Sequence, residues 1–195
     1  MRALVVHAHP NSDSFSHALR AAVERGLANG GHEADMMDLY ADGFVAAMTE
    51  EERRAYSGAS PIVSEQVAGY VERLKQAEAL VFVYPTWWWG MPAVMKGWFD
   101  RVLLPGVAFV LEEGKRPQPA LRHVRRLVGV TTYGASQAEM RFFQDAGRRT
   151  VTRTLRTLTR RRTTTTWLGM YRLDGASDAE RSQFLDQVEQ RMAQL

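Results

Sequence analysis

The sequence predicts an α/β protein in which a parallel sheet is covered by helices on both faces. Apolar runs of strand length alternate along the chain with stretches whose apolar residues recur at helical spacing, a pattern typical of successive βαβ units. The chain has 195 residues, of which 45% are hydrophobic, so it is long enough to bury a sizeable core. It contains no linker and no repeat, and we expect a single domain over residues 1–195.

Five segments have the length and composition of buried strands. The first, ALVVHA, is almost wholly apolar, the third is entered through Ala79-Leu80, and the last is rich in β-branched threonine. The expected strands are residues 3–8, 33–40, 81–84, 127–132 and 163–168.

Apolar residues recur at helical spacing in segments between the expected strands and in the segment that ends the chain. The first helix begins after the polar run 12–14 and stops at the glycine pair 30–31, and the last begins at Ser177, which forms a capping-box pattern with Glu180. The residues that define the helical faces are Phe15, Ala18, Leu19, Ala22, Val23 and Leu27; Val63, Val67, Val71 and Leu74; Val94, Met95, Trp98, Phe99 and Val102; Val151, Leu155 and Leu158; and Phe184, Leu185, Val188, Met192 and Leu195. Two long connections, 41–62 and 103–123, are the expected carriers of specificity.

Composition excludes several classes of protein. There is no cysteine, which rules out disulfide scaffolds, thiol nucleophiles and cysteine-based metal sites. The first fifteen residues hold only a short apolar run before histidines intervene, so neither a signal sequence nor a membrane span is indicated. We therefore expect a cytoplasmic protein without membrane insertion. The formal charge of +3 is too small to indicate a polyanionic partner.

Ligands of doubly wound sheets bind beyond the carboxyl ends of the strands, which directs attention to three loops. The first loop, HAHPNSDSFSH at residues 7–17, lacks the glycines of both nucleotide-binding fingerprints. It predicts an anion site at a helix N-terminus, with Ser14 and Ser16 as donors, or else simple helix capping. His7 and His9 share one face of a strand, but no acidic or histidine partner is evident at another strand end, so no metal is predicted.

The second loop, at residues 84–92, contains three consecutive tryptophans, Trp87, Trp88 and Trp89. Three in a row point in different directions, so at least one must face a crevice or a partner. A flat aromatic ligand and an oligomer interface are both consistent with this pattern. Trp98 and Phe99 in the following helix add to the apolar surplus and suggest a homodimer.

The third loop, Thr131-Thr132-Tyr133-Gly134-Ala135-Ser136, ends the fourth expected strand with hydroxyl groups and a glycine. It nearly matches the G-x-S-x-G nucleophile elbow, but the last glycine is absent and no histidine follows His123. Since the usual hydrolase order needs an acid and then a histidine after the serine, a serine hydrolase in that order is excluded.

Together, HAHPNSDSFSHAL, YPTWWWGMPAVMKGWFDRV and VTTYGA resemble the flavodoxin-like NAD(P)H:quinone oxidoreductases, a group that includes mammalian quinone reductases and bacterial potassium-efflux ancillary flavoproteins. The resemblance implies a flavodoxin-like three-layer sandwich whose five parallel strands have the order 2-1-3-4-5. It also implies a flavin, FMN or FAD, with NAD(P)H as electron donor, a quinone-like acceptor, and a homodimer with each flavin near the interface.

The same resemblance assigns the flavin contacts. The first loop would bind the phosphate, the second would hold one side and edge of the ring, and the third would hold its pyrimidine edge. The implied cofactor-binding residues are His9, Ser14, Phe15, Ser16, Pro85, Thr86, Trp87, Trp88, Trp89, Thr131, Thr132, Tyr133 and Gly134. The mammalian enzymes use a downstream tyrosine and histidine to manage charge on the reduced ring, and this chain lacks that pair. Either Tyr133 or backbone N–H groups would take over the task.

Two alternatives stay open. The chain could be a flavin-bound accessory or regulatory subunit of a membrane transport system, as the efflux proteins allow. Arginines also recur at helical spacing over residues 149–160, where Arg149, Arg153, Arg156 and Arg160 form a stripe. This stripe is either a solvated helix face or a contact for dinucleotide phosphate, and without interleaved aromatics it does not indicate nucleic-acid binding.

Overall fold

The computed structural model describes residues 1–58 and 60–195, and its centre is a five-stranded parallel sheet. The strand order β2-β1-β3-β6-β7 confirms the expected order 2-1-3-4-5. The strands are β1 (Arg2–His7), β2 (Glu33–Asp38), β3 (Ala79–Pro85), β6 (Arg126–Thr132) and β7 (Thr164–Met170). Each expected strand is present with ends shifted by a few residues.

Side chains that alternate along the strands feed two separate cores. In β1, Leu4 and Val6 pack into one core, while Ala3 and Val5 pack into the other. Both faces of the sheet are therefore buried, as the near-continuous apolar runs require.

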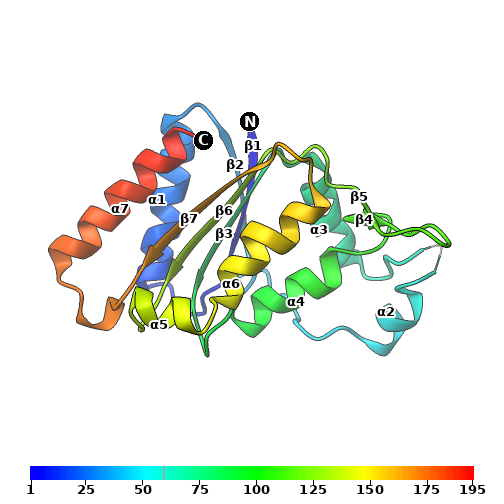
Figure 1. Ribbon diagram of the computed structural model, residues 1–195, viewed down its shortest axis with the longest axis horizontal. Coiled ribbons are helices and arrows are strands. Elements are labelled where there is room, and N and C mark those ends of the chain that lie inside the picture. The colour runs from blue at the N-terminus through cyan, green and yellow to red at the C-terminus, as the bar shows by residue number, and fades with distance from the viewer. Residues whose placement is uncertain (59) are drawn as a thin grey trace.

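Helices cover the two faces, as Figure 1 shows. α1 (Phe15–Asn29) and α7 (Asp178–Ala193) lie together on one face, and α3 (Glu65–Gln76) and α4 (Ala93–Val102) lie on the other. Gly26 permits the close approach of α1 to α7, because a Cβ atom there would lie 2.4 Å from the Glu189 carbonyl oxygen. The capping box at Ser177 and Glu180 is present at the start of α7.

The long connections contain structure that the sequence pattern did not predict. The first holds α2 (Glu50–Ala55), and the second holds the antiparallel pair β4 (Phe109–Val110) and β5 (Gln118–Pro119). α2 is fixed by Glu52, whose carboxylate accepts hydrogen bonds from Arg101 at 2.5 to 3.1 Å. Both side chains are buried.

The expected helix over 149–160 is only partly an α-helix. The segment runs from α6 (Ala146–Arg149) into a π-turn, η1 (Thr150–Thr154), and then a 3₁₀-turn, η2 (Leu155–Leu158). Its apolar face is nevertheless buried, with Val151 and Leu155 in the core. The spacing therefore identified the buried face correctly and the helix type incorrectly, since π- and 3₁₀-turns shift the period locally.

The helix α4 does not need an external partner for its large side chains. Trp98 is fully buried and Phe99 nearly so, and both contact Phe82 of β3. Trp98 and Phe99 therefore do not add to an exposed apolar surplus, because β3 covers them, and the homodimer stays a prediction. Among the residues described, no helix has the length and apolar character needed to cross a bilayer.

Candidate functional site

The three loops singled out in the sequence meet at the carboxyl edge of the sheet. The Thr86 backbone N–H donates to the Thr132 carbonyl at 2.8 Å, and the Thr86 and Thr131 hydroxyls lie 3.1 Å apart. The rings of His9 and Trp87 lie 5.7 Å apart between centroids. Hydrogen bonds thus join the second loop to the third, and a ring contact joins it to the first.

In the first loop, the serine hydroxyls are used within the protein. Ser14 caps α1 by accepting from the His17 backbone N–H, and the Ser16 hydroxyl is buried beside the His7 Nε2 at 3.2 Å. The prediction that both serines present hydroxyls to an anion is therefore not supported for Ser16. The backbone N–H groups of Phe15 and Ser16 form no hydrogen bond among the described residues, so they are the donors that this helix start offers an anion.

His7 lies at the centre of a polar cluster below this loop. Its Nδ1 lies 3.0 Å from Asp38 Oδ2, and His17 Nε2 lies 3.5 Å from the same oxygen. Burial lowers the pKa of His7 to about 4, although Asp38 opposes the shift. Burial acts to raise the pKa of Asp38, but hydrogen bonds from the Ala41 backbone and His7 outweigh it and hold that pKa below its ordinary value.

The expectation that His7 has no acidic partner at another strand end is wrong. Asp38 ends β2, the neighbour of β1, and the ligand atoms of His7, His17 and Asp38 all lie within 4.8 Å of one another. These three residues, and not the pair His7 and His9, are close enough to share a metal ion. In this structure both ring nitrogens of His7 are engaged in hydrogen bonds, Nδ1 with Asp38 and Nε2 with Ser16.

The second loop makes a tight turn that places two tryptophans in an unfavourable conformation. The Trp87 and Gly90 backbones exchange two hydrogen bonds of 3.0 Å, while Trp88 and Trp89 have φ angles of 48° and 62°. Bulky residues rarely adopt positive φ, and each costs about 1–2 kcal/mol. Trp88 is 95% exposed, so its burial does not offset this cost within the chain. Strain of this kind concentrates at ligand sites.

A cavity of about 230 Å³ lies between the second and third loops, and we call it the ring cavity. Its residues are Thr86, Trp88, Trp89, Tyr133, Gly134, Ala135 and Met140. The backbone N–H groups of Gly134 and Ala135 form no hydrogen bond within the part of the chain described. The cavity therefore combines aromatic sides with unused backbone donors.

Tyr133 is held from two directions. Its hydroxyl donates to Asp145 Oδ2 at 2.7 Å and accepts from Trp167 Nε1 at 3.0 Å, and its backbone N–H donates to the Met170 carbonyl at 2.8 Å. Burial, followed by the Asp145 contact, raises the pKa of this phenol. The hydroxyl proton is thus committed to Asp145, so direct stabilisation of ligand charge by Tyr133 remains a prediction that this geometry does not favour.

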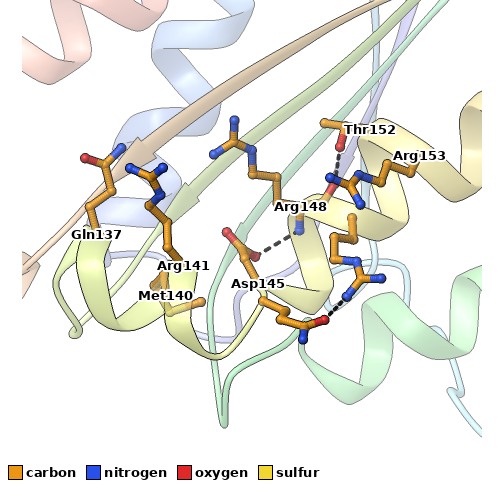
Figure 2. Close-up of a pocket in the computed structure, with 9 residues that line it drawn as sticks. Gln137, Met140, Arg141, Asp145, Arg148, Thr152 and Arg153 are labelled. Atoms are coloured by element: carbon orange, nitrogen blue, oxygen red, sulfur yellow. Dashed lines mark hydrogen bonds between the residues drawn. The ribbon is translucent and has the colours of Figure 1, made fainter.

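A second, larger cavity was not predicted from the sequence. It has a volume of about 700 Å³ and lies beside α5 (Gln137–Phe142), α6 and η1. Figure 2 shows Arg141, Arg148 and Arg153 extending around it. We call it the arginine cavity, and it shares Met140 with the ring cavity. The arginine stripe was the only signal of it in the sequence, because α5 was not recognised as a helix.

The fold and the site define a class: a doubly wound flavodoxin-like protein with an aromatic-sided cavity and unused backbone N–H donors at the carboxyl edge of its sheet. A family described by its flavodoxin-like fold matches residues 1–195. The chain belongs to the flavodoxin-like quinone reductase family, which confirms the resemblance seen in the three loop sequences.

Relatives agree with this assignment. The chain is 36% identical over 117 residues to an uncharacterised NAD(P)H oxidoreductase of Haemophilus influenzae, covering 59% of this chain and 56% of that protein. It is 30% identical over 149 residues to rat (Rattus norvegicus) NAD(P)H dehydrogenase [quinone] 1, covering 69% of this chain and 54% of the relative. The chain thus spans little more than half the length of these relatives.

Solved structures match over the whole fold. Smu.1420 from Streptococcus mutans superimposes with a TM-score of 0.86 at 26% identity, covering 100% of both chains. The NAD(P)H:quinone oxidoreductase of Methanothermobacter marburgensis gives 0.78 at 27% identity, covering 99% of this chain and 96% of that one. An FMN-dependent NADH-azoreductase of Bacillus anthracis, solved with FMN, shares the fold at 15% identity.

Proposed function

We propose that this protein is a flavin-dependent NAD(P)H oxidoreductase that passes two electrons from NAD(P)H to a quinone-like acceptor. One observation carries the proposal: unused backbone donors flank an aromatic-sided cavity at the carboxyl edge of a doubly wound sheet. This is the expected position for a ligand in such sheets. The names of relatives, which are NAD(P)H oxidoreductases and quinone dehydrogenases, support the same reaction.

The residues present fit a flavin. The Phe15 and Ser16 N–H groups at the start of α1 would bind the phosphate, with His9 and Ser14 beside them. The second loop would hold one side of the ring, and Gly134 would meet its polar edge. The proposed contacts remain His9, Ser14, Phe15, Ser16, Pro85, Thr86, Trp87, Trp88, Trp89, Thr131, Thr132, Tyr133 and Gly134.

When bound, the flavin supplies the capacity to accept and return a hydride. The chain contributes orientation and electrostatics. The free N–H groups of Gly134 and Ala135 would stabilise negative charge at the polar edge of a bound ring, in the manner of an oxyanion hole. Tyr133 acts as a positioning residue, because its hydroxyl ties the third loop to Asp145. Trp87 and Trp89, which are less exposed than Trp88, would shield one side of the bound ring from water.

We also propose that two copies of the chain assemble with this site near their interface. Trp88 is 95% exposed and Phe142 is 80% exposed. The ring centroids of the residues that follow them, Trp89 and Phe143, lie 4.2 Å apart. Exposed aromatic side chains gathered at one place are typical of interfaces. Size-exclusion chromatography with light scattering tests this, and a monomer at micromolar concentration would contradict it.

The proposed reaction is tested by anaerobic titration of the flavin-loaded protein. Absorbance bands that bleach with NADH or NADPH and return with a quinone are expected, and denaturation then identifies the released cofactor as FMN or FAD. A protein that binds flavin but shows no bleaching would contradict the oxidoreductase and favour the accessory subunit. A protein that binds neither flavin would refute the assigned contacts.

A further inference from the structure

We propose that the arginine cavity binds the phosphate groups of the electron donor, so that the protein uses NADPH in preference to NADH. This inference rests on the proposed function and assigns a site to the phosphate groups of the donor, whose ring would meet the flavin at the ring cavity. It also gives a role to the arginine stripe of the sequence.

Four guanidinium groups surround this cavity without acidic partners. They belong to Arg141, Arg148, Arg149 and Arg153. Among the residues that the structure describes, no carboxylate oxygen lies within 4.0 Å of any of them, and Arg149 donates only to the Gln144 amide oxygen. Like charges gathered without counter-charges repel one another, and an anion relieves that repulsion.

The one acid at the cavity is already occupied. Asp145 Oδ1 accepts from the Arg148 backbone N–H at 3.0 Å, and its Oδ2 accepts from the Tyr133 hydroxyl at 2.7 Å. It is buried, and its two hydrogen bonds shape the turn. With four arginines and this one aspartate, the residues that line the cavity have a net formal charge of +3.

The backbone around the cavity is built into an uncommon shape. Gln144 and Asp145 have φ angles of 64° and 33°, and η1 is a π-turn. Both features are costly or rare and are enriched at functional sites. The π-turn offsets the helical register between Arg149 and Arg153, which line the same cavity.

Position links the cavity to the donor. The ring cavity and the arginine cavity share Met140, and the hydrogen bond from Tyr133 to Asp145 joins their lining residues directly. In the proposed function the flavin ring occupies the ring cavity, so a donor whose own ring meets the flavin there could place its phosphates in the arginine cavity. A pyridine dinucleotide has both a ring and phosphates, whereas a quinone has no phosphate.

Charge argues for the extra phosphate of NADPH. The pyrophosphate carries about two negative charges and the 2′-phosphate adds about two more, so the net formal charge of +3 at the cavity exceeds what the pyrophosphate alone would neutralise. Arginine also binds phosphate oxygens in a bidentate manner, which gives specificity as well as affinity. A volume of about 700 Å³ lies within the range of nucleotide-sized sites.

The test compares variants of the flavin-loaded protein. Arg148→Gln and Arg153→Gln remove charges at the cavity, and Arg156→Gln is the matched control, because Arg156 belongs to the same exposed stripe but does not line the cavity. Calorimetric titration with adenosine 2′,5′-bisphosphate and with 5′-AMP measures phosphate recognition without any redox step. Steady-state kinetics then gives kcat/KM for NADPH, NADH and a neutral quinone.

We expect the wild-type protein to bind the bisphosphate at least tenfold more tightly than 5′-AMP. Each cavity variant should lose about tenfold of that affinity and of kcat/KM for NADPH, as the loss of one charge-assisted contact predicts. NADH should be affected less, and the KM for the quinone and all values of Arg156→Gln should be unchanged.

Three results would overturn the inference. Equal use of NADH and NADPH, equal losses in all three variants, or a rise confined to the KM for the quinone would each contradict it. The outcome is separable from that of the proposed function. If NADH reduces the flavin but the cavity variants change neither bisphosphate affinity nor kcat/KM for NADPH, only the inference is refuted. If the protein binds the bisphosphate selectively but neither donor reduces the flavin, only the oxidoreductase function is refuted.

Discussion

Two groups of arginines in this molecule have opposite surroundings. Arg101 is 5% exposed and donates to both carboxylate oxygens of Glu52 and to the Val45 carbonyl. Arg148 and Arg153 lie at the surface beside a large cavity and have no acidic partner among the described residues. The paired Arg101 holds a long connection against the sheet. The unpaired arginines are exposed, so their charge lowers the stability of the fold little and is available to a ligand. Pairing and burial therefore distinguish structural charge from functional charge better than residue type does.

The largest expected effect comes from breaking the buried pair. Arg101→Ala leaves the Glu52 carboxylate buried without its partner, which costs about 3–5 kcal/mol of unfolding free energy. Urea denaturation measures this change. The double variant Arg101→Met with Glu52→Leu should lose less, because neither charge is then stranded. A loss below about 1 kcal/mol for Arg101→Ala would mean that this pair does not anchor α2.

A second test concerns the buried His7, whose charge is excluded in the folded state. Its pKa is about 4 in the folded protein, compared with the ordinary value of 6.5. Between pH 6.5 and pH 4, His7 is therefore protonated in the unfolded chain but neutral in the folded chain. Stability should fall by about 3 kcal/mol as the pH falls from 6.5 to 4. Asp38 titrates below this window. The variant His7→Gln should flatten the slope, and an unchanged slope would show that other groups cause it.

A smaller effect is expected from the strained turn of the second loop. Trp88→Asn places a residue that tolerates positive φ at a position where Trp88 has φ of 48°. Since Trp88 is almost fully exposed, the variant should gain about 1 kcal/mol in stability. It should also weaken flavin binding, measured by fluorescence quenching. Loss of stability, or unchanged flavin affinity, would contradict the view that the strain is kept for a ligand.

The smallest effect on stability is expected at the arginine cavity. Arg148→Gln and Arg153→Gln should change the unfolding free energy by no more than about 0.5 kcal/mol, in contrast to Arg101→Ala. Raising the salt concentration should weaken NADPH binding while the Arg101–Glu52 pair is little affected, because exposed charges are screened and buried pairs are not. A salt-independent NADPH affinity would place the phosphates elsewhere.

Sequence reasoning was most successful where one physical cause dominates. Burial on both faces produced the apolar runs, so the strands could be predicted, whereas their order came from the family resemblance. The helix ends at Ser14 and Ser177 followed from capping chemistry. The three loops were located because strand ends gather at one edge of a parallel sheet.

The parts that were missed depend on contacts between distant residues. Asp38 meets His7 only because β2 pairs with β1, and Asp145 reaches Tyr133 only through a turn with positive φ. The spacing of residues along the sequence does not indicate either of these contacts. The arginine stripe was visible, but its division into Arg153 at the cavity and Arg156 outside it required the π-turn. The Ser16 hydroxyl was assigned to a ligand because its contact with the buried His7 could not be predicted from the sequence.

The most direct test of the proposed reaction is the anaerobic rate of flavin bleaching by NADPH and by NADH, measured by stopped flow for the wild type and for Arg148→Gln. We expect bleaching by both donors, faster with NADPH at limiting concentration, and a preference that falls about tenfold in the variant while the folded protein stays equally stable. A flavin-loaded wild type that neither donor bleaches would contradict the proposed reaction.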